Sequence, residues 1–346
     1  MKTVHIRTSG EYDVMIQRGL LSSLGEETAK LMPPCRAVLV CGEKSGALFA
    51  QHAEDSLRRA GFEVLRYVHP SGELSKSLAE YGALQLFLSE NHITRSDVLL
   101  ALGGGVTGDL AGFAAATYQR GMAYIQVPTT LLAAVDSSVG GKTALNLPSA
   151  KNQIGCFWQP KAVFCDPDTL SALSETEYRC GEAEVIKYAV LGDAAFFSAL
   201  EEQDIRSFEE EVIARCVAMK RDIVEADEFD TGCRRMLNLG HTIGHAIEKC
   251  SGFTWTHGDA VAAGLAFVMR GAARYGFCPA EDAARVLRLL EKYALPVACE
   301  FPRSQLYDAI LSDKKITGGK LHLVVPERIG SCRILPMEPE GILSWL

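Results

Sequence analysis

The sequence lacks the features of a membrane-spanning, secreted or disulfide-stabilised protein. Its longest apolar run, AVAAGLAFVM at 260–269, is too short to cross a bilayer. The first residues, MKTVHIRTSGEYDVMIQ, have no apolar signal-peptide core. The cysteines number eleven, which is odd, and include no CxxC pair. This pattern indicates free thiols rather than a disulfide framework. We therefore expect a cytoplasmic protein with no membrane partner.

An excess of positive charge is also missing. The chain has 35 Lys and Arg residues against 43 Asp and Glu residues, a net charge of −8. A chain this acidic is a poor general binder of nucleic acid, so we expect no nucleic-acid partner. An anionic ligand must instead meet a local cluster of basic side chains. The length of 346 residues with 48% apolar content indicates a large core and two domains.

The two halves of the chain differ in the periodicity of their hydrophobic residues. Short β-type runs at 36–41, 62–68 and 97–102 alternate with helical segments such as 76–90, which predicts a parallel sheet with crossover helices. After residue 170 nearly every segment has helical period, and only 320–325 and 331–335 suggest a late hairpin. We predict an α/β dinucleotide-binding domain over 1–170 and a mainly helical domain over 171–346.

A glycine run, ALGGGVTGD at 101–109, follows a buried strand and opens a helix. Gly103, Gly105 and Gly108 satisfy the dinucleotide fingerprint, in which glycines permit positive φ and let backbone N–H groups approach a pyrophosphate. The run follows several strands, and the next strand ends in PTT rather than in an acid. An ordinary strand-to-helix turn is therefore the alternative. SGE at 71–73 either binds a ribose or starts a helix.

Two histidines in NLGHTIGHAIE, His241 and His245, are four residues apart and so share one helix face. Glu184 in GEAEVIKYAVL and His257 in TWTHGDAVAAG are further candidate ligands. A carboxylate and two imidazoles leave one coordination position open, as catalytic zinc requires. From spacing alone His245 is an equal candidate. Each residue taken singly is more typical of a hydrogen-bonded histidine or a solvated glutamate.

Several cations stand beside glycine turns or apolar helices. Lys220 lies on the apolar stripe of its helix, so its ammonium either snorkels to solvent or meets an anion such as a ligand phosphate or carboxylate. The other members of this group are Lys142, Lys151 with Asn152, Lys187, Arg234 and the DKK of 313–315.

Together these segments resemble the 3-dehydroquinate synthase family of sugar phosphate cyclases almost end to end. The blocks that carry the resemblance are GGGVTGDLAGFAAATYQRG, VPTTLLAAVDSSVGGKTALN, KNQIG, GEAEVIKYAV, LNLGHTIGHAIE, HGDAVAAG and DKK. The resemblance implies that Glu184, His241 and His257 bind Zn2+ or Co2+, whereas His245 turns toward substrate. It also makes the helical domain the metal- and substrate-binding one.

The resemblance implies further roles for named residues. The implied catalytic residues are Lys142, Lys187, His245, Asp136, Asn152 and Lys151. The implied substrate-binding residues are Arg120, Lys220, Arg234, Asn238, Lys314 and Lys315. The implied NAD+ contacts are Glu73, Lys76, Gly104, Gly105, Asp109, Thr129, Thr130, Lys142 and Lys151. Arg120 is similar to a residue that reaches the phosphate site of a neighbouring subunit, which implies a homodimer.

The implied reaction converts 3-deoxy-D-arabino-heptulosonate 7-phosphate to 3-dehydroquinate and phosphate. NAD+ oxidises a ring hydroxyl, phosphate leaves by β-elimination, the hydride returns, the ring opens and an aldol step closes the carbocycle. The metal polarises the hydroxyl and the carbonyl. Rival interpretations are another sugar phosphate cyclase, such as 2-deoxy-scyllo-inosose synthase or 2-epi-5-epi-valiolone synthase, and an iron-dependent polyol dehydrogenase.

Two stretches depart from the family pattern. DEFD at 227–230 stands where a DERE-like run is usual, so Phe229 and Asp230 differ from it, and the shorter acid at 230 is expected to weaken a contact behind the site. Gly42 stands where an Asp or Asn often meets the adenosine ribose. Either Glu43 or Ser45 replaces it, or the affinity for NAD+ is lower.

Overall fold

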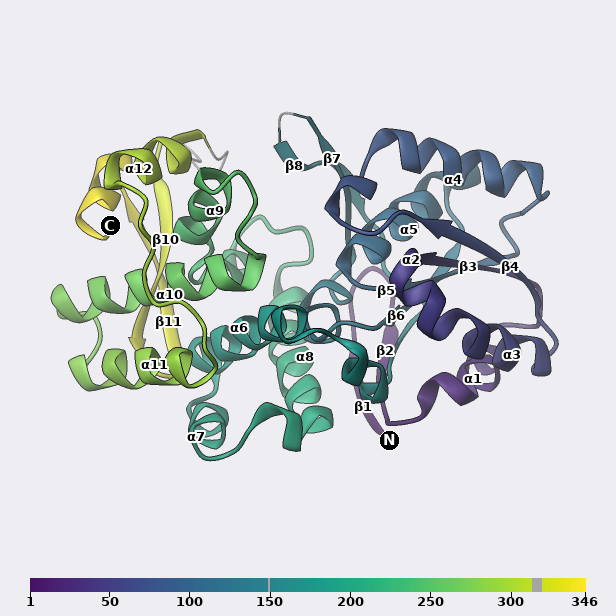
Figure 1. The fold of residues 1–346 in the computed structure, drawn as a ribbon, viewed down its shortest axis with the longest axis horizontal. Helices are drawn as coiled ribbons and strands as arrows, with labels where there is room; N and C mark the ends of the chain where they lie inside the picture. Colours follow the sequence, from purple (N-terminus) through teal and green to yellow (C-terminus); the bar gives the residue numbers. More distant parts are fainter. Residues whose placement is uncertain (149, 313–318) are drawn as a thin grey trace. The chain divides into compact units, whose positions relative to one another are not determined.

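The computed structural model describes residues 1–148, 150–312 and 319–346 (Figure 1). The chain forms two compact units. The first contains Met1–Leu173 and Lys220–Phe229, and the second contains Ser174–Met219 and Asp230–Leu346.

The segment Lys220–Phe229 departs from the single boundary expected at residue 170. Polar contacts attach it to the first unit, because the carboxylate of Glu225 accepts from the Arg7 N–H at 2.7 Å and that of Glu228 accepts from the Ser9 N–H at 2.8 Å. Lys220 adds a bond to Asp136, described below. Helical period alone gave no sign of these contacts.

The first unit is built on a seven-stranded sheet with the order β1-β2-β9-β6-β5-β3-β4. All neighbouring strands run parallel except β1, which pairs antiparallel with β2 at one edge. The strands are β1 (Lys2–Ile6), β2 (Tyr12–Ile16), β3 (Arg36–Gly42), β4 (Glu63–His69), β5 (Val98–Gly103), β6 (Ala123–Pro128) and β9 (Ala162–Cys165). The predicted parallel sheet is thus confirmed, with one antiparallel edge strand that was not foreseen.

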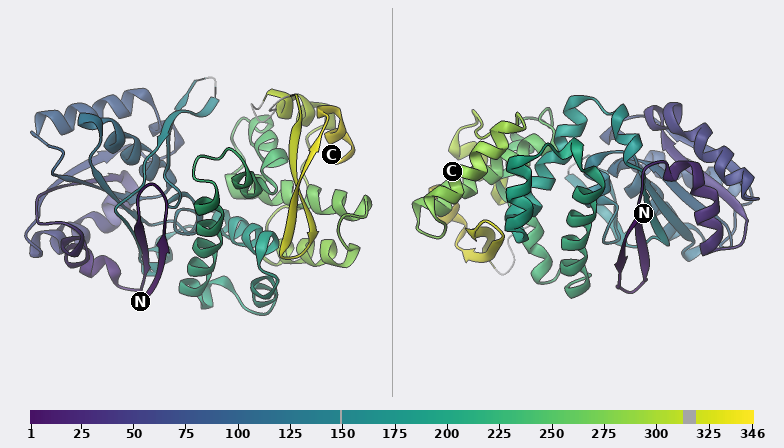
Figure 2. Two further views of the ribbon diagram at one scale, coloured as in Figure 1. Left: turned by 180° about the vertical axis from the view of Figure 1, so that it is seen from behind. Right: turned by 90° about the horizontal axis from the view of Figure 1, so that it is seen from below.

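Helices cover both faces of this sheet, as the two views in Figure 2 show. In β3, Leu39 belongs to the core beneath α1 (Leu24–Leu31) and α3 (Gln51–Arg59), whereas Val38 belongs to the core beneath α4 (Leu78–Glu90) and α5 (Gly105–Thr117). Strands buried on both faces read as continuous apolar runs rather than as alternating ones. This explains why β3 and β5 were recognisable from sequence.

Shorter elements complete the first unit. A separate antiparallel hairpin pairs β7 (Lys142–Leu147) with β8 (Ala150–Phe157). The remaining segments are η1 (Leu20–Ser23), α2 (Glu43–Ser45), η2 (Gly46–Ala50), η3 (Glu73–Ser75), η4 (Tyr118–Arg120), η5 (Ala133–Ser137) and η6 (Pro167–Ala172).

The second unit is mainly helical, as predicted, with one antiparallel hairpin of β10 (Leu321–Arg328) and β11 (Ser331–Met337). Its helices are α6 (Glu175–Gly192), α7 (Ala194–Glu202), α8 (Glu209–Ala226), α9 (His241–Cys250), α10 (His257–Arg274), α11 (Ala280–Lys292) and α12 (Arg303–Ser312), of which α8 ends in the first unit. Short turns are η7 (Ile205–Ser207), η8 (Cys233–Asn238) and η9 (Pro339–Ser344). Among the described residues, none of the helices has the length and apolarity needed to cross a membrane.

Candidate metal centre and nucleotide turn

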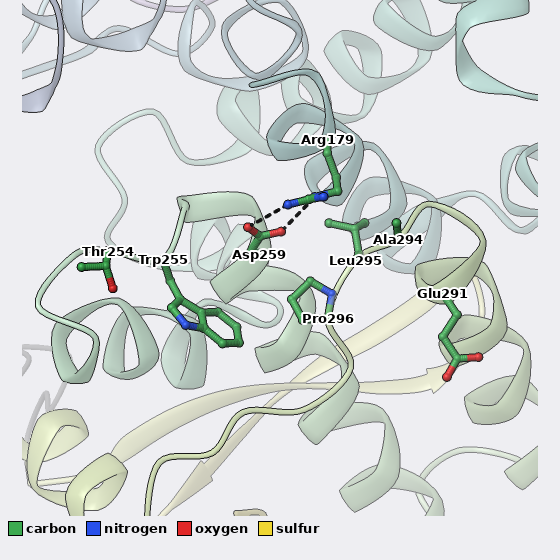
Figure 3. A pocket seen from close by; sticks show the side chains of 8 residues that line it. All are labelled: Arg179, Thr254, Trp255, Asp259, Glu291, Ala294, Leu295 and Pro296. Carbon is green, nitrogen blue, oxygen red and sulfur yellow. Dashed lines mark hydrogen bonds and ion pairs between the residues drawn. The ribbon is translucent and has the colours of Figure 1, made fainter. Parts of the chain in front are cut away.

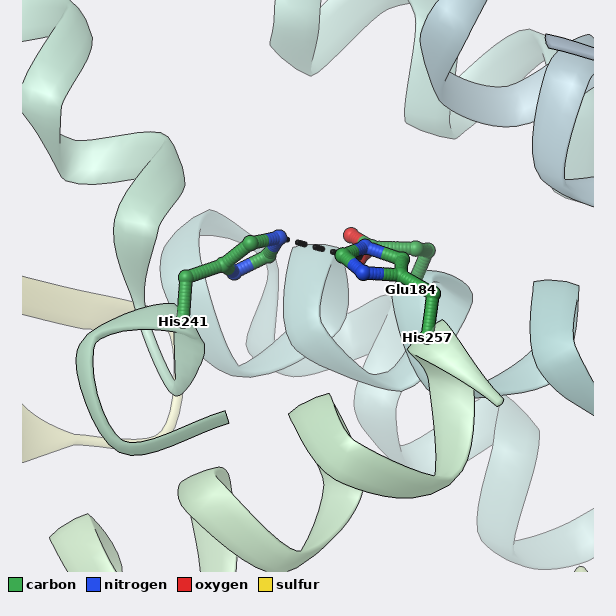
Figure 4. Close-up of side chains that lie close together, drawn as sticks. All are labelled: Glu184, His241 and His257. Atoms are coloured by element: carbon green, nitrogen blue, oxygen red, sulfur yellow. Dashed lines mark ion pairs between the residues drawn. The ribbon is translucent and has the colours of Figure 1, made fainter. Parts of the chain in front are cut away.

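Three side chains of the second unit converge from three helices. Glu184 lies in the buried middle of α6, while His241 and His257 are the first residues of α9 and α10. Glu184 is fully buried. Figure 4 shows the two imidazole rings facing its carboxylate. The ligand atoms of all three residues lie within 4.8 Å of one another.

The spacing of these atoms suits a divalent metal. The Nε2 atoms of His241 and His257 lie 3.2 Å and 3.3 Å from Oε1 of Glu184. Tetrahedral zinc with bonds of about 2.1 Å holds its ligand atoms about 3.4 Å apart. Neither oxygen of the buried Glu184 carboxylate has a hydrogen bond of acceptable geometry among the described residues, and Oε2 forms an ion pair with the Lys187 ammonium at 2.5 Å. The Oε1 atom, which faces the two imidazoles, fits a cation bound between it and them.

Each imidazole is oriented by a contact to its other nitrogen. Nδ1 of His241 donates to the carbonyl oxygen of Leu239 at 3.0 Å. Nδ1 of His257 donates to Oε2 of Glu248 at 3.4 Å. A hydrogen on Nδ1 leaves Nε2 as the lone-pair nitrogen, and such outer partners typically fix the tautomer of metal-binding histidines. Sequence analysis missed Glu248, although its position seven residues after His241 and three after His245 puts it on the same helix face.

The electrostatics of the cluster favour an ionised carboxylate. Burial alone would raise the pKa of Glu184, but the Lys187 ammonium and the His241 imidazole hold that pKa well below its usual range. Burial lowers the pKa of His241 and outweighs the attraction of Glu184, so this ring is neutral. Burial also opposes a charge on His257, but its contacts with the Glu184 and Glu248 carboxylates raise its pKa to about 10, so a bound metal would take the place of the Nε2 proton.

His245 and Lys187 lie beside the three converging residues. The His245 ring centroid is 5.4 Å from that of His241 and 6.1 Å from that of His257. His245, Glu248 and His257 form a second group with metal-ligand spacing. The first group includes the fully buried Glu184, whose Oε1 faces both imidazoles. The Nζ atom of Lys187 lies 2.5 Å from Oε2 of Glu184, so the two oxygens of this carboxylate face different cations.

Close helix packing fixes the start of α10. Gly258 lies against α6, because a Cβ atom there would come within 2.4 Å of Cys180 backbone atoms. Asp259 pairs with Arg179 of α6 at 3.2 Å. The same pair lines a pocket of about 560 Å³ that Trp255, Leu295 and Pro296 also border (Figure 3). Both contacts hold the turn that carries His257.

The glycine run forms a tight turn at the carboxyl end of β5. Gly104 is the N-cap of α5 and makes no side-chain capping bond. None of the predicted glycines, Gly103, Gly105 and Gly108, has positive φ, so that expected reason for glycine was wrong. Glycine is instead required at these positions because neighbouring side chains approach the backbone closely. A Cβ atom would lie 2.4 Å from Thr107 Oγ1 at Gly103 and 2.5 Å from Gln126 Oε1 at Gly108.

Two threonines and a carbonyl complete this turn. Thr129 donates its N–H to the Gly103 carbonyl at 2.9 Å. A Cβ atom at Gly104 would lie 3.1 Å from Thr130 Cγ2, and one at Gly105 would lie 3.0 Å from Ser137 Oγ. The uncapped N–H groups of α5 at the carboxyl edge of a parallel sheet form an arrangement that binds phosphate groups in nucleotide-binding folds. The residues present therefore fit a pyrophosphate.

The predicted nucleotide contacts Lys76 and Asp109 belong to one hydrogen-bonded network around the buried Lys76 ammonium. Lys76 Nζ donates to Asp109 Oδ2 at 2.6 Å and to Asn152 Oδ1 at 2.5 Å. Burial raises the pKa of Asp109, and Lys76 offsets part of this effect. Asn146, which sequence analysis missed, donates to Glu73 Oε1 at 2.7 Å and accepts from the Asn152 N–H at 2.8 Å. The network attaches the β7–β8 hairpin, which carries Lys142 and Lys151, to η3.

Lys220 has an anionic partner within the protein. Its Nζ donates to the carbonyl oxygen of Asp136 at 2.7 Å and to Oδ1 of the same residue at 2.9 Å. The ammonium is buried, so the snorkelling interpretation was wrong. The two residues come from segments 84 positions apart, and sequence alone offered no reason to pair them.

The other predicted residues are placed as follows. Arg234 is buried in η8, which also contains Asn238 and directly precedes α9. Arg120 is exposed and has φ of 69°, next to Gln119 with φ of 47°. Two consecutive non-glycine residues with positive φ are rare, and their backbone is strained. Lys314 and Lys315 lie outside the described residues.

Solved structures define the class of protein. A 2-epi-5-epi-valiolone synthase from Streptomyces hygroscopicus, solved with NAD+ and Zn2+, matches 99% of this chain and 97% of its own with TM-score 0.89 and 25% identity. A 2-deoxy-scyllo-inosose synthase matches 99% of both chains with TM-score 0.87 and 24% identity. An iron-containing alcohol dehydrogenase from Thermococcus thioreducens matches less well, with TM-score 0.67, 17% identity and 96% of both chains. The fold is that of the sugar phosphate cyclases.

Sequence comparisons identify the family. The models described as 3-dehydroquinate synthase N-terminal and C-terminal match residues 66–180 and 181–316. Proteins named 3-dehydroquinate synthase are 43% identical in Enterococcus faecalis, over 100% of this chain and 98% of the relative, and 40% identical in Streptococcus suis, over 97% and 96%. The chain belongs to the 3-dehydroquinate synthase family.

Proposed function

We propose that the protein converts 3-deoxy-D-arabino-heptulosonate 7-phosphate to 3-dehydroquinate and phosphate, using NAD+ and a divalent metal. The observation that carries this proposal is the convergence of Glu184, His241 and His257 in a chain that matches 3-dehydroquinate synthases over its whole length. The identity of the substrate is inferred from the family resemblance. The metal-dependent chemistry is inferred from the cluster of Glu184, His241 and His257.

In the second unit, Glu184 and the two imidazoles would hold Zn2+ or Co2+. A bound metal supplies a Lewis acid for a substrate hydroxyl and carbonyl. Glu248 and the Leu239 carbonyl keep the ring hydrogens on Nδ1, so that both Nε2 atoms remain ligands. Lys187 neutralises the second oxygen of Glu184 and presents an ammonium next to the metal position. His245, Arg234 and Asn238 then contact substrate.

In the first unit, the turn at Gly104 and Gly105 would bind the pyrophosphate of NAD+, and bound NAD+ supplies the hydride acceptor and donor. Thr129 and Thr130 border this turn, while Glu73, Lys76 and Asp109 hold the adjoining network. Lys142, Lys151 and Asn152 lie on the hairpin attached to that network. Their cations and amide suit an anionic substrate in a protein whose net charge is −8.

We further propose a homodimer in which Arg120 binds the phosphate of a substrate held by its partner. The strained turn at Gln119 and Arg120 supports a functional position for this exposed side chain. We also propose that the enzyme acts in the cytoplasm, since all eleven cysteines are free thiols, as a reducing compartment maintains them.

The test is incubation of the zinc-loaded protein with the heptulosonate phosphate and a trace of NAD+. We expect stoichiometric phosphate and cyclic product with no accumulation of NADH, because the hydride returns to the substrate. A sugar phosphate without a carboxylate serves as the matched control substrate and should not be turned over. NADH formed in step with product would identify a dehydrogenase and refute the proposal. Turnover of the control substrate alone would indicate another sugar phosphate cyclase.

A further inference from the structure

His69, the last residue of β4, is a buried histidine to which sequence analysis gave no role. The residue is only 2% exposed, and its ring makes two hydrogen bonds. Nδ1 lies 2.8 Å from the carbonyl oxygen of Pro70, and Nε2 lies 3.0 Å from Thr107 Oγ1. A carbonyl oxygen only accepts, so Nδ1 carries a hydrogen. Nε2 is the hydrogen-bond partner of the Thr107 hydroxyl, so both ring nitrogens are satisfied.

The partner of His69 lies in the glycine turn itself. Thr107 is the third residue of α5, and its N–H is among the first N–H groups of that helix. Its side chain lies directly on Gly103, where a Cβ atom would come within 2.4 Å of Thr107 Oγ1. The hydrogen bond between His69 and Thr107 therefore involves the side chain that packs across the turn between β5 and α5.

The ring also contacts the end of β3. Gly42 is the β-sheet partner of His69, and a Cβ atom at Gly42 would lie 3.3 Å from Cε1 of the ring. A side chain at residue 42 would require this ring to shift by a few tenths of an ångström. Gly42, His69 and Thr107 therefore pack together at the carboxyl ends of three neighbouring parallel strands, β4, β3 and β5. Ligands of open α/β sheets bind at this edge.

Ser45 and Glu43, the two expected substitutes for a side chain at residue 42, differ in their contacts. Ser45 Oγ donates to the Leu102 carbonyl at 3.0 Å and accepts from the Gly42 N–H at 3.2 Å. Its hydroxyl is therefore hydrogen-bonded to the backbone. Glu43 is exposed, and its Oε2 accepts from the Ser71 N–H at 3.1 Å. Of the two, Glu43 is the side chain that faces outward at this edge.

We propose that His69 is a positioning residue of the nucleotide site, which holds Thr107 and with it the first turn of α5 in the conformation that receives the pyrophosphate. This inference rests on the proposed use of NAD+. Loss of one buried hydrogen bond behind the turn should weaken NAD+ binding about five- to tenfold without changing the metal site.

The test compares the Kd of NAD+ alone, measured by calorimetry, in Thr107→Val, His69→Phe and the double variant. Valine has the shape of threonine without its hydroxyl, so Thr107→Val removes the bond and little else. We expect each single variant to bind about five- to tenfold more weakly, and the double variant to bind more tightly than the product of the two effects predicts. Zinc content and kcat at saturating NAD+ should stay within about twofold of wild type, so that only the affinity or KM for NAD+ moves.

Thr28→Val is the matched control. Thr28 is a buried threonine of the same unit, and its hydroxyl donates to the Leu24 carbonyl at 2.7 Å within α1. This variant should lose stability but retain its affinity for NAD+. If His69→Phe fails to fold, as judged by circular dichroism, Thr107→Val alone decides the question.

The outcomes distinguish failure of the proposed function from failure of the proposed role of His69. Wild-type protein that binds no NAD+ would refute the proposed function. Wild-type protein that binds NAD+ with the same affinity as Thr107→Val would overturn the role of His69 and leave the proposed function intact. Independent, fully additive effects of the two single variants would also overturn it.

Discussion

Replacing Glu248 with alanine should weaken zinc binding about tenfold, although Glu248 is not itself a proposed ligand of the bound metal. Its carboxylate holds the hydrogen of His257 on Nδ1 and fixes the ring plane, so that Nε2 stays directed at Glu184. Without this partner the imidazole gains a second tautomer and new rotamers, and the metal must select the correct one.

The magnitude follows from the contact distances. Loss of such an outer partner typically costs about 10- to 100-fold in metal affinity. The His257–Glu248 contact is 3.4 Å, longer than the 3.0 Å between His241 and the Leu239 carbonyl. A long contact orients the ring less strictly, so we expect the lower limit, about tenfold or about 1.4 kcal/mol. Glu248→Gln retains an oxygen acceptor and should lose less affinity than Glu248→Ala.

The assay is competition for zinc with a chromogenic chelator, at fixed pH, with circular dichroism as a check on folding. Glu209→Gln is a matched control, since Glu209 is a buried carboxylate of the same unit that accepts from the Tyr178 hydroxyl at 2.8 Å. His257→Ala should lose zinc altogether. Wild-type zinc affinity in Glu248→Ala, or an equal loss in Glu209→Gln, would refute the reasoning.

Three further predictions concern the cations. Lys187→Ala should lower kcat by about a hundredfold or more while zinc content is unchanged; full activity would contradict its assigned role. Co-production of Arg120→Ala and Lys187→Ala chains, each inactive alone, should restore about a quarter of wild-type activity, because half of randomly paired dimers regain one complete site; no restoration would count against action across subunits. Lys220→Met should lower the free energy of unfolding by about 2 kcal/mol in urea, since it removes the ammonium that meets the Asp136 carboxylate. The double variant Lys220→Met/Asp136→Ala should lose less stability than the sum of the two single variants, and additive losses would contradict a direct pair.

Sequence patterns predicted those elements whose burial is uniform along the chain. β3 and β5 are apolar on both faces, and the helices of the second unit have a continuous apolar stripe. Both kinds of element could therefore be recognised from the sequence. The β7–β8 hairpin was not recognised, because its sequence includes polar residues such as Asn152, whose side chain accepts a hydrogen bond from Lys76, a residue 76 positions earlier in the chain. β1 was missed for a related reason, since an edge strand is apolar at few positions.

The candidate metal ligands could be named in advance, but their selection needed more than spacing. His241 and His245 are equivalent by helical periodicity; the family resemblance favoured His241, and in the structure its Nε2 lies 3.2 Å from the buried Glu184 carboxylate. The glycine turn was located correctly for a partly wrong reason, because close packing rather than positive φ excludes larger residues there. His69 gave no local signal, since its partner lies 38 residues away.

The division of the chain into units has a practical consequence for fragments. Because Lys220–Phe229 belongs to the first unit, the polypeptide passes from one unit to the other at residues 173/174, 219/220 and 229/230. A truncation after residue 173 would deprive the first unit of the ammonium that meets Asp136 and of the acids that accept from the Arg7 and Ser9 amides. Neither half should therefore be obtained in native form by a single cut, and complementation between two such pieces should require that the N-terminal one extend through residue 229.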